Sequence, residues 1–106
     1  MFNPVLFFPL IVLAVDGPSQ TSPKMLTIRN TSWDAVRVEV RVGPSTQCDA
    51  NAHSAVKTLG RDRTWAIVSD EVICWRREQT PGDPNSAWSA WAQTRLALDE
   101  VRDVTL

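Results

Sequence analysis

Residues 36–42 read VRVEVRV, the most regular pattern in the chain. Valine occupies every second position, and the charged residues Arg37, Glu39 and Arg41 stand between the valines. Successive side chains of a β-strand point to opposite faces, so the alternation predicts a strand with one buried and one solvated face. We expect the four valines to face a core and the three charged side chains to lie in water. A register shift of one residue would bury the charges at high cost.

Short apolar runs separated by turn residues continue on both sides of this strand. We expect further strands at residues 25–29, 55–59, 64–69, 72–78 and 101–106. Residues 60–63 (GRDR) read as a turn, and the two runs that flank it are expected to form a hairpin. On the strand that follows, Cys74 and Trp75 should point to opposite faces. Several short strands with frequent turns predict an all-β fold, either a small antiparallel β-sandwich or a partly open barrel.

The segment 87–98 allows two interpretations. Trp88, Trp91, Ala92 and Leu96 would share one face of a helix. The strand pattern of the residues that follow favours β structure toward the end of the chain instead. A short helix within this segment therefore stays open as an addition to the all-β fold.

The first 24 residues differ from the rest of the chain. Residues 5–15 (VLFFPLIVLAV) form an apolar run that is shorter than the roughly 20 residues of a membrane span and is typical of a secretory signal peptide. Residues 16–24 (DGPSQTSPK) have the composition of a linker. We interpret 1–24 as signal peptide and linker and 25–106 as a single β domain of a secreted or periplasmic protein. Met25 allows a second interpretation, in which translation starts there and the protein is cytoplasmic.

Cys48 and Cys74 are the two cysteines of the chain. In an oxidising compartment they predict one disulfide, with Cα atoms within about 7 Å of each other, whereas in the cytosol they would be buried thiols. The run CDANAH also places Asp49 and His53 near Cys48 as possible metal ligands. A structural zinc site usually needs four ligands, and a second pair is missing here. We therefore expect a polar loop, with no metal and no cofactor.

The composition argues against several classes of function. A formal net charge of −1 over 106 residues lacks the basic excess of a nucleic-acid-binding protein. The chain has one histidine and lacks a nucleophile elbow, an HExxH motif, a P-loop and a dinucleotide fingerprint. We therefore expect a non-catalytic protein. Asn30-Thr31-Ser32 matches the N-glycosylation sequon, which matters only in a secreted eukaryotic protein.

Five tryptophans are the best functional lead. Trp88 and Trp91 follow a loop rich in Pro, Gly and Asn, where binding residues concentrate, whereas Trp65 is expected in the core. Exposed indoles stack on sugar rings or apolar ligands, and nearby arginines add cation–π contacts. Arg76 and Arg77 therefore join Trp88 and Trp91 as candidate binding residues. On a regular strand, residues three apart point to opposite faces. The two indoles can therefore share one platform only if their segment is not a regular strand.

Two functional hypotheses follow. The first is a non-catalytic binding module for carbohydrate or envelope material. The alternative is a structural or protein-interaction subunit, or a small inhibitor, that acts through a sheet face or edge. An exposed aromatic cluster in a groove would favour the first hypothesis, and an uncovered sheet edge or flat apolar patch would favour the second. The sequence leaves the oligomeric state open.

Overall fold

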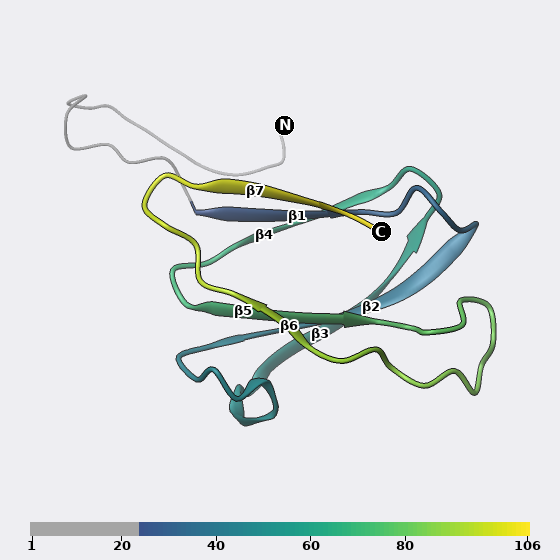
Figure 1. Ribbon diagram of the computed structural model, residues 1–106, viewed down its shortest axis with the longest axis horizontal. Coiled ribbons are helices and arrows are strands. Elements are labelled where there is room, and N and C mark those ends of the chain that lie inside the picture. Colours follow the sequence, from purple (N-terminus) through teal and green to yellow (C-terminus); the bar gives the residue numbers. More distant parts are fainter. Residues whose placement is uncertain (1–23) are drawn as a thin grey trace.

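Two stacked β-sheets make up the fold in the computed structural model, which describes residues 24–106 (Figure 1). One sheet has the strand order β4-β1-β7 and the other β3-β2-β5-β6. The strands are β1 (Met25–Arg29), β2 (Ala35–Gly43), β3 (His53–Gly60), β4 (Thr64–Val68), β5 (Val72–Arg77), β6 (Ala92–Thr94) and β7 (Val101–Thr105), and a short 3-10 helix, η2 (Cys48–Ala50), precedes β3. The predicted all-β fold is confirmed, in its open two-sheet form.

The valine face of β2 lies against the core, as its alternation predicts. Val36 and Val38 are fully buried, Val40 is nearly so, and Val42 packs at the margin. The other buried members of this core come from both sheets and from the segment after β6: Leu26, Ile28, Leu59, Ile67, Ile73 and Leu96. The alternation of side chains along the strand thus explains why the valines of the longest strand share the face that packs against the core.

The opposite face of β2 departs from the prediction at one residue. Glu39 was expected in water, but it is buried, with 6% of its surface exposed. Arg37 and Arg41 remain partly exposed on either side of it. The reason is tertiary, because arginine and tryptophan side chains from distant positions cover this part of the sheet, as described below.

The hairpin predicted across residues 60–63 is wrong. The turn itself forms, with the amide of Arg63 donating to the carbonyl of Gly60 (3.1 Å), but β3 pairs with β2 and β4 pairs with β1. The chain therefore crosses from one sheet to the other at this turn. Amides of the turn donate to the carbonyls of Asn30 (2.6 Å) and Asp34 (3.0 Å), which holds the crossing against the connection between β1 and β2.

Asn30 is fully buried within that connection. Its Nδ2 donates to the carbonyls of Trp33 (2.9 Å) and Leu59 (3.0 Å), and its Oδ1 accepts from the amides of Ser32 and Trp33. These contacts use the two donors and the two lone pairs of the amide. The sequon therefore does not present its asparagine at the surface, and a glycan at Asn30 is incompatible with this fold.

The segment 87–98 contains no helix. Its backbone is hydrogen-bonded to β5 instead. The amide of Ser89 donates to the carbonyl of Arg77 (2.8 Å), and β6 pairs with β5. The helical alternative fails because these cross-strand bonds use the backbone groups that a helix would need. β7 then returns to the other sheet, as the closing strand predicted there, and pairs parallel with β1 (Figure 1).

Cys48 and Cys74 form the predicted disulfide, with Cα atoms 5.7 Å apart. The bond ties η2 to β5 on the face of the sheet that points away from the core, where Val72 packs beside it. Trp75 packs against the core on the other face, as expected. Because its sulfur is bonded to Cys74, Cys48 has no free thiolate that could bind a metal together with Asp49 and His53.

The signal peptide and linker interpretation concerns residues that lie, except for Lys24, outside the described part of the chain. β1 begins at Met25, where the β domain was expected to start. Among residues 24–106, the structure contains no helix with the length and hydropathy of a membrane-spanning segment.

Candidate functional site

Tryptophan and arginine side chains gather on the outer face of the four-stranded sheet, the face that points away from the core. Two arginines come from β2 and one from β5, and the ladder places Arg76 directly opposite Glu39. Two indoles come from the segment between β5 and β6. We call these five residues the Trp–Arg cluster: Arg37, Arg41, Arg76, Trp88 and Trp91.

Arg76 is the centre of the Trp–Arg cluster. Its guanidinium carbon lies 4.2 Å from the ring centroid of Trp91 and 5.2 Å from that of Trp88. Arg41 approaches the ring of Trp91 (6.0 Å), and Arg37 approaches the ring of Trp88 (5.5 Å). The indoles share one platform because residues 89–91 are not a regular strand. Cation–π contacts of this kind contribute about 0.5–1 kcal/mol each at exposed sites.

Glu39 holds two of these guanidinium groups in place. Its Oε1 accepts from Nε of Arg76 (2.8 Å) and pairs with Nη2 (2.7 Å), and its Oε2 accepts from Nε of Arg41 (3.3 Å). A buried carboxylate is costly unless it is paired and hydrogen-bonded. Here the pairing also orients the guanidinium groups toward the indoles.

Three of the four predicted site residues come together, and one does not. Trp88, Trp91 and Arg76 belong to the cluster, whereas Arg77 lies over the ring of Trp33 at 4.7 Å. Neighbours on a strand point to opposite faces, so Arg76 and Arg77 diverge. Arg37 and Arg41 also belong to the cluster, although the sequence did not predict them as binding residues. Their alternation on β2 indicated a shared face, but no local signal showed which segment would cover it.

The indoles of the cluster are half-buried and already engaged within the domain. Nε1 of Trp91 donates to Oδ1 of Asp49 (3.3 Å), and its ring packs against the disulfide. The guanidinium of Arg76 contacts both rings. An indole whose ring is paired with arginine offers less surface for stacking on a sugar.

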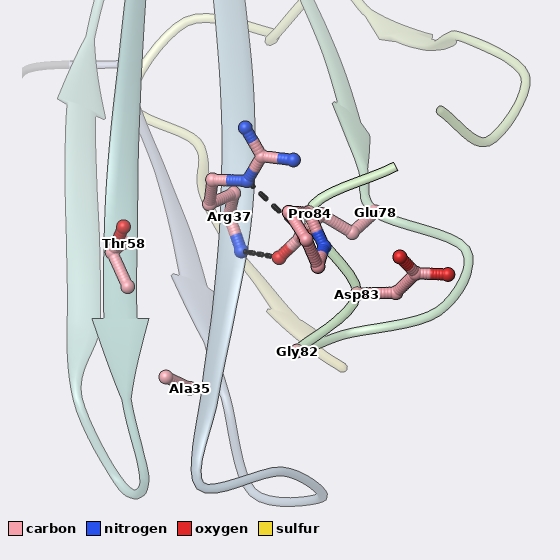
Figure 2. A pocket seen from close by; sticks show the side chains of 7 residues that line it. All are labelled: Ala35, Arg37, Thr58, Glu78, Gly82, Asp83 and Pro84. Atoms are coloured by element: carbon pink, nitrogen blue, oxygen red, sulfur yellow. Dashed lines mark hydrogen bonds and ion pairs between the residues drawn. The ribbon is translucent and has the colours of Figure 1, made fainter. Parts of the chain in front are cut away.

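A shallow cleft of about 260 Å³ lies beside Arg37 (Figure 2). Glu78 forms part of its wall and accepts from the backbone amide of Arg37 (2.7 Å), while its other oxygen pairs with the guanidinium (3.1 Å). Asp83, on the loop across the cleft, accepts from the amide of Asn85 (2.9 Å). The charged groups of the cleft are thus paired with protein atoms. Its volume is also below the roughly 300–1,000 Å³ of small-molecule pockets.

A second cleft, of about 330 Å³, opens between β3 and β4, the edge strands of the two sheets. Trp65 lines it and packs against the core as expected, yet remains partly exposed. Nζ of Lys57 lies 5.2 Å from the centroid of that ring. The remaining lining is largely apolar: Val40, Val42, His53, Ser54, Ala55, Ala66, Ile67 and Val68.

β3 is an edge strand beside this cleft. Among residues 24–106 it pairs with β2 on one side only, and residues 53–58 are all exposed. Val56, a large apolar residue, keeps 53% of its surface in water. Native edge strands are normally guarded by several charges, prolines or bulges. Residues 53–58 carry only Lys57 as a fixed charge and no proline, so β3 is a template for pairing with another strand.

The fold and its surfaces define an open two-sheet β domain in which β3 is a long edge strand with a single fixed charge. Comparison with protein-family models, with curated proteins and with solved structures finds no significant match.

Proposed function

We propose that this protein is a non-catalytic protein-interaction domain that binds its partner by strand pairing along β3. The exposed run of residues 53–58 on an eight-residue edge strand carries the proposal. In strand addition, main-chain hydrogen bonds supply affinity and pockets for alternate side chains supply specificity. The apolar cleft between β3 and β4 adjoins the edge and is placed to receive such side chains.

The proposal includes export of the protein, with residues 1–24 acting as signal peptide and linker. The disulfide between Cys48 and Cys74 supports this part, because disulfides persist mainly in oxidising compartments. Carbohydrate or envelope material is the competing ligand class. It receives less support, because the indoles of the Trp–Arg cluster pair with arginines of the same domain.

Selection from a phage-displayed library of random peptides tests the proposal with the purified protein as bait. We expect enriched peptides with apolar residues at alternate positions. Their binding should slow hydrogen exchange at residues 53–58, because amides that point away from β2 then donate to the added strand. Val56→Lys should weaken binding, whereas Val101→Lys, a matched change at an equally exposed valine on β7, should leave it unchanged.

Two results would contradict strand pairing along β3. One is the absence of peptides with an alternating pattern. The other is binding that perturbs the indole signals of Trp88 and Trp91 and leaves β3 unprotected. Retention on a polysaccharide matrix that is lost in Trp88→Ala would favour the carbohydrate hypothesis instead.

A further inference from the structure

The register of β3 against β2 assigns each of its side chains to a face. Leu59 lies opposite Val36 and Lys57 opposite Val38, so the odd-numbered residues of β3 share the inner face with the valines. Val56 lies opposite Glu39 on the outer face. Any strand added to this edge must match these faces, because residues opposite each other in a ladder point to the same side.

A second copy of β3 can meet this edge across a twofold axis. For antiparallel strands this axis is perpendicular to the sheet, so both copies keep the same inner and outer faces. The two longest registers that match the faces are centred on Val56 and on Lys57, and each leaves a single residue of β3 unpaired. Centring on Lys57 sets two ammonium groups directly opposite each other, which is unfavourable.

The register centred on Val56 avoids this conflict. It sets Val56 against its own copy, Ala55 against Lys57, Ser54 against Thr58 and His53 against Leu59. No two charges of the same sign lie directly opposite each other. The exposed valine at the centre is then shielded by an identical side chain, which is a favourable cross-strand pair.

The same axis also brings the two apolar clefts together. Because the inner faces of the two copies point to the same side, both three-stranded sheets lie on that side of the extended sheet. β4 is the edge of its sheet next to β3, so the two clefts open toward each other across the axis. The partly exposed Trp65 of each copy thereby gains shielding from water that an isolated strand partner would not give.

We infer that the partner of β3 is a second copy of this chain, paired antiparallel through Val56 into a continuous sheet across a twofold axis. This inference rests on the proposed function of β3 as a pairing edge. A single pair of strands is a small contact compared with stable interfaces of roughly 1,200–2,000 Å². Association is therefore expected to be weak and to depend on concentration.

Sedimentation equilibrium and oxidative cross-linking of the full chain test the inference. We expect a reversible monomer–dimer equilibrium that Val56→Lys weakens by about tenfold, since two lysines then face each other. Val101→Lys should dimerise like the original protein, and a thermal melt verifies that both variants fold. Val56→Cys should form a disulfide-linked dimer, because opposed Cα atoms in such a ladder lie about 4.5–5.5 Å apart.

Thr58→Cys is the matched control, because Thr58 faces Ser54 of the other copy and lies far from its own counterpart. Monomers at every concentration, or equal cross-linking of the two cysteine variants, would overturn the inference. If the protein is monomeric while selected peptides still protect β3, the second copy fails as the partner and the proposed function stands. If peptides also fail to protect β3, both proposals fall.

Discussion

Glu39 is the residue on which the geometry of the Trp–Arg cluster depends. Its carboxylate is buried and pairs with Arg41 and Arg76, and both of these guanidinium groups contact an indole. Replacing one partner of a buried ion pair leaves uncompensated charge behind. The cluster is therefore a unit, in which the charged residues hold the aromatic ones.

Glu39→Ala is expected to lower the free energy of unfolding by about 3 kcal/mol, near the lower end for buried pairs because the arginines are partly exposed. Urea unfolding followed by tryptophan fluorescence measures this. Glu71→Ala, at an exposed carboxylate, should change stability by less than about 0.5 kcal/mol. Equal losses in the two variants would mean that Glu39 contributes nothing beyond an ordinary surface charge.

Trp88 and Trp91 are expected to contribute differently to stability. Trp91 packs against the disulfide and Val72, whereas Trp88 belongs to neither apolar cluster of the described residues. We expect Trp91→Ala to cost about 3 kcal/mol and Trp88→Ala about 1 kcal/mol, the latter mainly through lost cation–π contacts. Denaturant midpoints of the two variants provide the measurement. A larger loss of stability in Trp88→Ala than in Trp91→Ala would contradict the packing role assigned to Trp91.

Among the elements, η2 depends on its covalent tie to β5. The bridge between Cys48 and Cys74 closes a loop with a sequence separation of 26. Chain entropy predicts a stabilisation of about 3.5 kcal/mol for such a loop. Reduction with dithiothreitol, or the double variant Cys48→Ser/Cys74→Ser, should therefore lower the denaturant midpoint clearly. A reducing agent that leaves the midpoint unchanged in the original protein would show that the bridge adds no stability.

Glu100 lies in the turn that leads into β7, and its carboxylate accepts two hydrogen bonds there. The backbone amide of Ala97 and then the guanidinium of Arg102 donate to its carboxylate, which lowers the pKa of Glu100 from its ordinary value. A carboxyl whose pKa is lowered on folding stabilises the fold above its unfolded pKa, and this contribution disappears as the pH falls through the folded pKa. Carbon-13 NMR titration should show the lowered pKa, and Arg102→Gln should raise it. An identical pKa in both proteins would contradict the role of Arg102.

The whole molecule, over residues 24–106, consists of a three-stranded sheet that lies against a four-stranded sheet. Leu59 is the buried residue of β3, and its other inward positions, His53, Ala55 and Lys57, stay exposed. At the other end of the narrower sheet, β7 closes the structure next to β1, with Val104 and Leu106 packed against the core. The core is thus completed beside β7, whereas no strand of the described residues pairs with the outer side of β3.

Deletion of residues 101–106 is expected to unfold most of the protein. It removes the only parallel partner of β1 among the described strands and two side chains that pack against the core, and the total stability of a domain is only about 5–15 kcal/mol. Circular dichroism and thermal melting measure the loss. A chain that begins at Lys24 serves as the control and should keep its melting temperature. A cooperative, unchanged melt after the C-terminal deletion would remove β7 from the structural core.

Local sequence patterns predicted the features that depend on neighbouring residues. The alternation in 36–42 predicts the buried face of β2, and the residues GRDR at 60–63 predict the turn that forms there. Strand alternation also separated Cys74 from Trp75, because residues adjacent on a strand diverge. The grouping of Arg76 with Arg77 as candidate binding residues did not follow this rule, and the two contact different indoles. Side-chain alternation and turn chemistry act over a few residues, so they can be read locally.

Local sequence patterns did not predict which strands pair and which surfaces remain open. β3 joined β2 rather than β4, Glu39 was buried beneath arginines, and the Trp–Arg cluster gathered from three separate segments. Each of these outcomes depends on segments that are separate in the chain and meet only when the four-stranded sheet assembles and the residues after β5 lie over its outer face. Burial on this outer face and exposure of an edge strand are properties of the assembled sheet, and a local pattern contains no information about which segment will cover it.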